Sequence, residues 1–169
     1  ASIATSPARK EPLALMQNPF YQTYRVGAIM AGAEPRYLSH SGFPEFALDF
    51  AELDQATLSR TSILYLCSPS NPDGRVIPQQ QMRWAIEAAR RHNFLVVFDE
   101  CYAELYDDAP PSGALDVLAA MDASGHWLDN TLVLYGSAHP HDAHSGHNYP
   151  LQLAGGKNMG FQHGHLHEF

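Results

Sequence analysis

The chain of 169 residues has the length of one ordinary domain, with 45% apolar and 17% charged residues. This balance argues against wholesale disorder, and apolar runs such as Phe94–Phe98 are far too short to span a bilayer. The formal charge of -8 at pH 7 disfavours a nucleic-acid surface, which needs clustered Lys and Arg to neutralise phosphates. We therefore expect neither a nucleic acid nor a membrane as a partner.

The first half of the chain alternates candidate strands and helices. We predict a strand at Leu13–Gln17, then a helix over Phe20–Ala31 that ends at Gly32. A second strand over Pro35–His40 and a short helix over Phe50–Leu58 follow.

The middle of the chain forms one complete βαβ unit. Ile63–Cys67 is a short apolar strand, and Ser68–Gly74 is a loop because its two prolines and its glycine disfavour regular structure. Apolar residues at i, i+3, i+4 and i+7 predict a helix from about residue 78 to 92, with Asn93 as its C-cap. Phe94–Phe98 is apolar on both faces, as expected of a central parallel strand.

A helix at Asp116–Met121 and a strand at Thr131–Tyr135 complete the pattern. The alternation of strands and helices predicts an α/β fold with three layers, in which helices flank a mostly parallel sheet. Ligands of such folds bind at the carboxyl ends of the strands. Asn71, Asp99 and Glu100 each follow a predicted strand, so we expect a site there.

The composition changes near Tyr135, where we place a domain boundary between residues 1–135 and a tail over residues 136–169. Few charged residues lie in this tail, and glycine is frequent there. Seven of the ten histidines also lie in it: His139, His141, His144, His147, His163, His165 and His167. We expect the tail to be poorly ordered, because glycine-rich polar sequence buries little apolar surface.

The tail histidines offer an alternative function as a binding module. His139, His141, His144 and His147, with Asp142, have spacings of two and three that Zn, Ni or Cu could use. The spacing matches no regular zinc finger, so we interpret the tail as solvated and assign no metal site.

Two cysteines cannot form a disulfide framework, and Ala1–Lys10 lacks the apolar core of a secretory signal. We therefore expect a reducing, cytoplasmic compartment. Cys67 lies in an apolar run and Cys101 beside two carboxylates, and we interpret both as buried structural thiols. The acidic pair is expected to raise the pKa of the neighbouring thiol rather than to activate it.

Two motifs at strand ends resemble those of a known family. Ser68–Gly74 is similar to the Asn-Pro-x-Asn-Pro-Thr-Gly loop, and Asp99–Leu105 to the Asp-Glu-x-Tyr-x-x-Leu motif, of the aspartate-aminotransferase-like, fold-type I enzymes that use pyridoxal 5'-phosphate. Asn18–Tyr24, followed by Gly32–Pro35, is similar to their cofactor-stacking segment. The resemblance covers about residues 13–135, and it is strongest to bacterial N-succinyldiaminopimelate aminotransferases of lysine biosynthesis.

The resemblance implies roles for four residues. Asp99 would pair with the pyridinium nitrogen of pyridoxal 5'-phosphate, which preserves the ring as an electron sink. Asn71 and Tyr102 would bond to the phenolic oxygen of the ring, and Tyr21 would stack on its face. The implied substrates are small amino and keto acids, with glutamate as donor and a keto acid of the N-succinyl-2-amino-6-ketopimelate type as acceptor. Complete members of the family are expected to be homodimers.

The resemblance breaks at the Schiff-base lysine of the family, whose position falls on His139 in the segment Gly136–His139. Imidazole forms no Schiff base, so His139 could serve only as a proton acceptor. Also absent are the family's phosphate-binding hydroxyls and arginine after that lysine, the phosphate loop before Leu13 and the substrate-binding arginine of a small domain. We expect an incomplete large domain that is inactive alone. A non-catalytic α/β domain that binds no cofactor stays an alternative.

Overall fold

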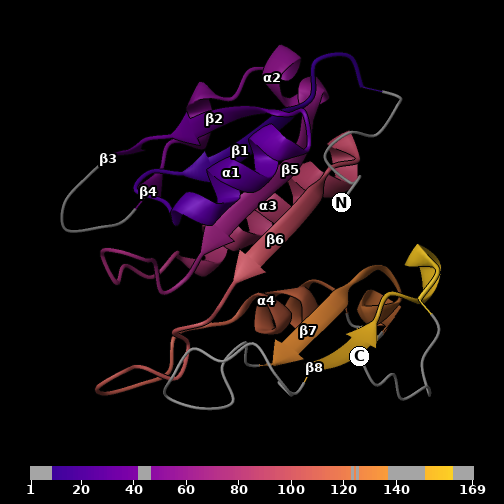
Figure 1. The fold of residues 1–169 in the computed structure, drawn as a ribbon. Coiled ribbons are helices and arrows are strands. Elements are labelled where there is room, and N and C mark those ends of the chain that lie inside the picture. Colours follow the sequence, from indigo (N-terminus) through magenta and orange to yellow (C-terminus); the bar gives the residue numbers. More distant parts are fainter. Residues whose placement is uncertain (1–8, 42–46, 123, 125, 137–150, 162–169) are drawn as a thin grey trace. The chain divides into compact units, whose positions relative to one another are not determined.

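A computed structural model describes residues 9–41, 47–122, 124, 126–136 and 151–161 (Figure 1). The chain divides into two compact units, Ala1–Val117 and Leu118–Phe169, and each is described by itself. The compositional boundary near Tyr135 lies inside the second unit. The separate character of the tail stays a prediction.

A four-stranded parallel sheet forms the centre of the first unit (Figure 1). Its strands are β1 (Leu13–Gln17), β2 (Glu34–Leu38), β5 (Thr61–Cys67) and β6 (Leu95–Asp99). They lie in the order β2-β1-β5-β6, and every neighbouring pair is parallel. The predicted mostly parallel sheet flanked by helices is therefore confirmed.

The strand order reverses between β1 and β5, because the chain moves outward from β1 to β2 and later in the opposite direction from β5 to β6. Crossovers between parallel strands are right-handed, so the two connecting helices, α1 (Gln22–Met30) and α3 (Gln79–His92), cover opposite faces of the sheet (Figure 1). A sheet covered on both faces must be apolar on both. All five residues of β1 are indeed buried.

The helix α1 packs on this sheet through one face. Tyr24 and Ala28, four residues apart, are its buried residues and join a core with Ala14, Met16 and Ile63. The helix ends where the sequence predicts, since Gly32 has a φ of 76° that favours glycine.

The predicted helix over residues 50–58 is broken in the structure. A 3-10 turn, η2 (Phe50–Glu52), is followed by the short helix α2 (Gln55–Arg60). The carboxylate of Asp49 accepts a bond from the backbone N–H of Ala51, and that of Asp54 accepts one from Thr57. Each aspartate thus caps a new element, and an N-cap residue has non-helical backbone that a continuous helix would not allow.

The predicted end of α3 is confirmed. Asn93 is its C-cap and has a φ of 55°, in the left-handed region that asparagine tolerates better than most residues.

Two short strands, β3 (His40–Ser41) and β4 (Ala47–Leu48), follow β2 along the chain and pair with each other in antiparallel orientation.

The second unit holds an antiparallel pair of strands, β7 (Leu132–Gly136) and β8 (Leu151–Gly155). The 3-10 turns η3 (His126–Asn130) and η4 (Lys157–Met159) accompany them. The helix α4 (Ala114–Met121) spans the division between the units. The strand predicted at Thr131–Tyr135 corresponds to β7, whose partner comes from the histidine-rich region.

A buried glutamine joins β1 to β5 where their pairing ends. The register of the two strands runs to Met16 and Tyr65, after which the side chain of Gln17 continues the hydrogen bonding. Its Oε1 accepts from the backbone N–H of Cys67 at 2.8 Å, and its Nε2 donates to Oγ of Ser70 at 2.9 Å. Gln17 is fully buried, so these bonds have no competition from water.

Replacing Gln17 by leucine should therefore lower the free energy of unfolding by about 2 kcal/mol or more, because each buried polar group left without a partner costs about 1–3 kcal/mol. Urea unfolding followed by circular dichroism measures this change. The matched control is Gln79→Leu, which removes an exposed amide that donates to Ser112 at 2.6 Å and should change the stability by no more than about 0.5 kcal/mol. Equal losses in the two variants would contradict the role of Gln17.

Candidate functional site

The loop that follows β5 is held in one conformation by bonds between its own residues. The hydroxyl of Ser68 accepts from the backbone N–H of Ile77 at 3.0 Å. The backbone N–H of Ser70 donates to the carbonyl of Arg75 at 2.8 Å, and that of Gly74 donates to the carbonyl of Ser70 at 2.7 Å. Gly74 has a φ of 70°, which favours glycine. Asn71 is therefore presented from an ordered loop at the carboxyl edge of the sheet.

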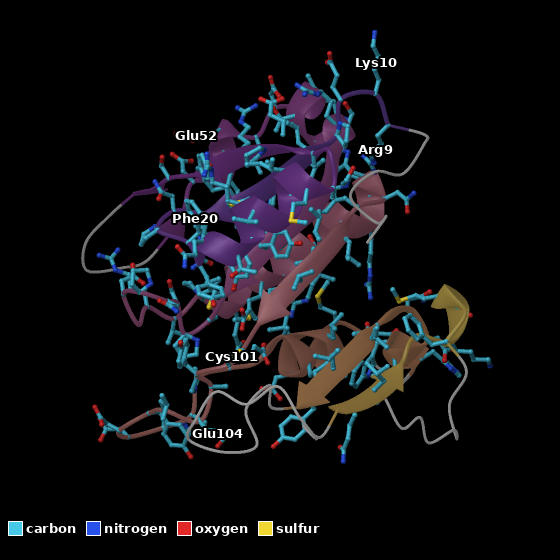
Figure 2. All side chains as sticks on the ribbon, in the orientation of Figure 1. Arg9, Lys10, Phe20, Glu52, Cys101 and Glu104 are labelled. Atoms are coloured by element: carbon cyan, nitrogen blue, oxygen red, sulfur yellow. The ribbon has the colours of Figure 1, made fainter. Side chains whose placement is uncertain are left out.

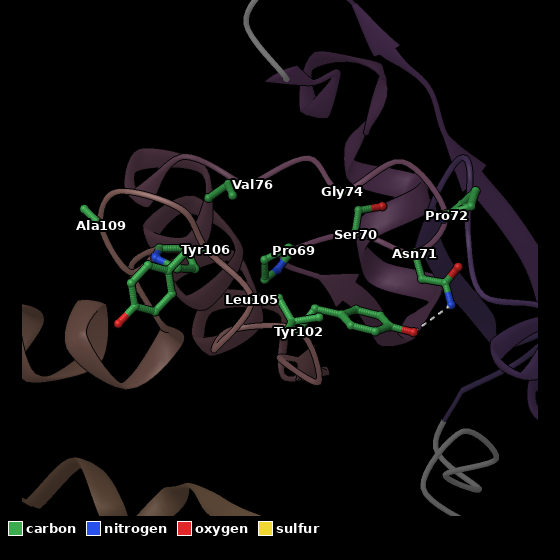
Figure 3. A pocket seen from close by; sticks show the side chains of 11 residues that line it. Pro69, Ser70, Asn71, Pro72, Gly74, Val76, Tyr102, Leu105, Tyr106 and Ala109 are labelled. Atoms are coloured by element: carbon green, nitrogen blue, oxygen red, sulfur yellow. Dashed lines mark hydrogen bonds between the residues drawn. The ribbon is translucent and has the colours of Figure 1, made fainter. Parts of the chain in front are cut away.

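Asn71 and Tyr102, which come from the two strand-end motifs, lie together. The Nδ2 of Asn71 donates to Oη of Tyr102 at 3.3 Å (Figure 3). Tyr102 belongs to a turn just after β6, in which the backbone N–H of Ala103 bonds to the carbonyl of Glu100 at 3.0 Å. The amide and the phenol are both accessible, so both could bond to one acceptor atom of a ligand.

Asn71 and Tyr102 also line a cavity of about 530 Å³ beside the loop. Tyr102 and its neighbours present exposed apolar side chains there, including Leu105. The residues that line it come from the two segments that follow β5 and β6 (Figure 3): Pro69, Ser70, Asn71, Pro72, Gly74, Val76, Tyr102, Leu105, Tyr106, Ala109 and Pro111. Asp99 and Tyr21 do not line it.

Asp99 is the last residue of β6 and pairs with Cys67 of β5 across the sheet. Its carboxylate is partly buried, and its Oδ2 accepts a hydrogen bond from the hydroxyl of Tyr24. Its Oδ1 accepts from the backbone N–H of Cys101 at 3.3 Å. The carboxylate is therefore fixed from two sides, by α1 and by the segment that follows its own strand.

Tyr21 lies at the start of α1, where it is the N-cap residue, and 43% of its surface is exposed. Its ring meets that of Tyr24 edge-on, with ring centroids 5.8 Å apart and planes at 81°. The ring of Tyr24 is stacked instead on Tyr65, at 4.8 Å and 4°. Tyr21 thus stands one helical turn from a residue that bonds to Asp99.

Cys67 lies between these groups. Its buried thiol donates to the carbonyl of Pro69 at 3.2 Å, and it is also bonded to Tyr24 and to the backbone of Asn71. Burial raises the pKa of the Cys67 thiol. The interpretation of Cys67 as a buried structural thiol agrees with this surrounding.

The two carboxylates that end β6 differ in environment. Oε1 of Glu100 accepts from the backbone N–H of Ala114 at 2.6 Å, at the beginning of α4. Burial raises the pKa of the Glu100 carboxyl. Glu100 therefore serves the start of a helix, whereas Asp99 contacts α1 through Tyr24.

Sequence reasoning missed Tyr24, because a tyrosine on the buried face of an amphipathic helix resembles any other core residue. Its spacing from Tyr21, three positions along the same helix, is the only local signal that could have indicated it. The interpretation of Cys101 was wrong, since this thiol is exposed. It lies two residues after the end of β6 (Figure 2), where the polypeptide leaves the sheet and enters a surface turn.

His139 lies outside the residues that the structure describes, as do His141, His144, His147 and Asp142. Their roles stay predictions. Within the described ranges, no three His, Cys, Asp or Glu side chains are arranged to hold a metal ion. No helix in this part of the chain is long and apolar enough to cross a membrane.

Comparison with known proteins identifies the family. The model of the class I and II aminotransferases matches residues 2–138, and the chain belongs to this family. A histidinol-phosphate aminotransferase of Methanosarcina barkeri is 36% identical over 93 residues, which are 55% of this chain and 24% of that protein. An LL-diaminopimelate aminotransferase of Dehalococcoides mccartyi is 32% identical over 111 residues, which are 65% of this chain and 29% of that protein.

Solved structures with a similar fold are also aminotransferases. An aminotransferase structure from Neisseria meningitidis is 25% identical, with a TM-score of 0.73 over 92% of this chain and 38% of that chain. The chain spans about a quarter of the length of the two curated relatives. It therefore has the fold of the fold-type I aminotransferases over part of their length.

Cys101 provides a test of the electrostatics around Asp99. A hydrogen bond to the Asp99 carboxylate, with burial, raises the pKa of Cys101 to about 11. The thiolate is the reactive form, so alkylation by iodoacetamide should be slow at pH 8 and should accelerate up to about pH 11. Asp99→Asn removes the negative charge, lowers this pKa and should raise the rate at pH 8 by about 10-fold or more.

The rate is measured by mass spectrometry of the peptide that contains Cys101. Glu104→Gln is the control, because Glu104 is an exposed carboxylate in the same turn region and should leave the rate unchanged. A wild-type rate that levels off near pH 9, or that Asp99→Asn does not alter, would contradict the assignment.

Proposed function

We propose that this chain carries the cofactor-facing part of an aminotransferase that uses pyridoxal 5'-phosphate. The observation that carries the proposal is the carboxylate of Asp99 at the end of β6, fixed by the hydroxyl of Tyr24. The amide–phenol pair of Asn71 and Tyr102 at the same edge of the sheet supports it. Family membership supports the reaction class.

The donors and acceptors present fit the groups of this cofactor. A carboxylate offers about four acceptor sites, and the bonds that Asp99 makes with Tyr24 and Cys101 leave a site for a ring N–H. Asn71 and Tyr102 have N–H and O–H groups suited to a phenolic oxygen. The exposed ring of Tyr21 is suited to stacking in an offset contact.

In this proposal Asp99 holds a proton on the ring nitrogen, Asn71 and Tyr102 orient the ring by its phenolic oxygen, and Tyr21 covers one face. The cofactor, when bound, withdraws electrons from the α-carbon of an amino acid and so makes its proton acidic. The residues of this chain supply the position and the charge that this chemistry requires.

We propose that the amino donor is glutamate and that the acceptor is a keto acid of the N-succinyl-2-amino-6-ketopimelate type, which would place the complete protein in lysine biosynthesis. Two observations support this proposal. The amino-acid sequences of residues 18–35 and 67–76 resemble those of N-succinyldiaminopimelate aminotransferases, and one relative is named as an LL-diaminopimelate aminotransferase. The histidinol-phosphate aminotransferase among the relatives makes a phosphorylated acceptor the natural comparison in an assay.

The proposal predicts that the chain binds pyridoxal 5'-phosphate and that Asp99→Ala weakens this binding about 10-fold or more. A hydrogen bond to a charged group contributes about 1.5–3 kcal/mol, and about 1.4 kcal/mol is a factor of ten in affinity. Equilibrium dialysis, followed by the absorbance of the cofactor, measures the dissociation constant. Asp108→Ala, which removes an exposed carboxylate, is the control and should leave the affinity unchanged. Equal affinities of wild type and Asp99→Ala would contradict the site.

The chain by itself should have no appreciable transaminase activity, because the resemblance assigns His139 to the position of the family's Schiff-base lysine. A general acid or base contributes about two to four powers of ten in rate, and His139 could replace only this function of the lysine. The measurement is a half-reaction with glutamate and pyridoxal 5'-phosphate, followed by absorbance against a protein-free control. Turnover well above that control, abolished by Asp99→Ala, would overturn the prediction.

A further inference from the structure

We propose that Tyr24 is a positioning residue that aims the Asp99 carboxylate at the ring nitrogen of the cofactor. This inference rests on the proposed function, since it assumes that Asp99 meets that nitrogen. The one hydroxyl–carboxylate bond between α1 and the end of β6 carries it.

The position of the Tyr24 hydroxyl is set by packing. Tyr24 is only 8% exposed and belongs to the core under α1. Its ring is stacked on Tyr65, with centroids 4.8 Å apart and nearly parallel planes. A ring held by packing cannot swing its hydroxyl to another acceptor without opening the core. The phenol therefore imposes a position on the carboxylate, rather than following it.

The bond restricts the carboxylate to one orientation. Oδ2 accepts from Tyr24, while Oδ1 accepts from the backbone N–H of Cys101 at 3.3 Å. Two donors from different segments fix the rotation of the carboxylate about its bond to the chain. Burial, together with the bond to Asp99, raises the pKa of the Tyr24 phenol well above its usual range. Tyr24 therefore stays protonated at neutral pH and acts as the donor in this bond.

The ring of Tyr24 also contacts the ring of Tyr21. The two rings meet edge-on at 5.8 Å, so the face of Tyr21 is oriented by the residue that orients Asp99.

An aliphatic residue at position 24 could fill the space under α1 equally well. Burying a carboxylate beside a phenol gains little net stability, because the carboxylate loses hydration. Positioning for a ligand explains the polar pair better than stability does.

Tyr24→Phe removes the hydroxyl and keeps the stacked ring. Two probes then separate positioning from structure: pyridoxal 5'-phosphate, and its 1-deaza analogue, in which a C–H replaces the ring nitrogen. Tyr24→Phe should weaken the binding of pyridoxal 5'-phosphate about 3- to 10-fold, as loss of one hydrogen bond does. The binding of the deaza analogue should change less than about twofold, since it offers Asp99 no N–H.

Tyr65→Phe is the matched control, because it removes a hydroxyl from the ring stacked on Tyr24. It should leave the affinity for both probes unchanged. A second check is the double variant Tyr24→Phe with Asp99→Ala, whose affinity for pyridoxal 5'-phosphate should equal that of Asp99→Ala alone.

Each other outcome overturns the inference. Equal weakening of both probes, or a Tyr24→Phe chain that does not fold by circular dichroism, would assign the hydroxyl to stability. Unchanged binding of pyridoxal 5'-phosphate by Tyr24→Phe, when Asp99→Ala weakens it, would refute the positioning alone. Failure of the wild-type chain to bind pyridoxal 5'-phosphate would refute the proposed function, and this inference with it.

Discussion

Two right-handed crossovers that leave the centre of a parallel sheet in opposite directions determine where this chain can bind a ligand. Between β1 and β5 the connections diverge to opposite faces, so no helix covers the strand ends there. The side chain of Gln17 bridges the divergence with bonds to Cys67 and Ser70. The ends of β1, β5 and β6 thus stay in register, and the candidate site residues follow those ends.

The candidate site combines one partly buried and one accessible pair of polar groups. Tyr24 and Asp99 are joined where the phenol is buried and the carboxylate partly buried, and a hydrogen bond is electrostatically stronger there than in water. Asn71 and Tyr102 meet at 3.3 Å near the surface. The partly buried pair suits a permanent task, which is holding a carboxylate in one orientation. The accessible pair suits a ligand that enters and leaves.

The fold was largely predictable from sequence, because its signals are local. Apolar runs located the four parallel strands to within about two residues, and the positions of Gly32 and Asn93 marked helix ends. The prediction of one helix over residues 50–58 was wrong, because Asp49 caps a 3-10 turn and Asp54 caps a separate helix. Such side-chain caps compete with helix propensity.

The site was only partly predictable. Asn71, Asp99 and Tyr102 come from motifs, and the structure brings Asn71 and Tyr102 together. Tyr24 contacts a residue 75 positions away, and no local pattern distinguishes such a contact from ordinary burial. Glu100, adjacent to Asp99, serves a helix 14 positions away. Hydrogen-bond partners that tertiary packing brings together cannot be predicted from the pattern of a single segment.

The protonation of the bound ring nitrogen tests the central claim, that Asp99 is a carboxylate positioned for this cofactor. Pyridoxal 5'-phosphate labelled with ¹⁵N in the ring reports this state through its NMR chemical shift. At a pH where the free cofactor has an unprotonated nitrogen, we expect a protonated nitrogen on the wild-type chain and an unprotonated one on Asp99→Ala. An unprotonated nitrogen on the wild-type chain, or the same shift for both proteins, would contradict it.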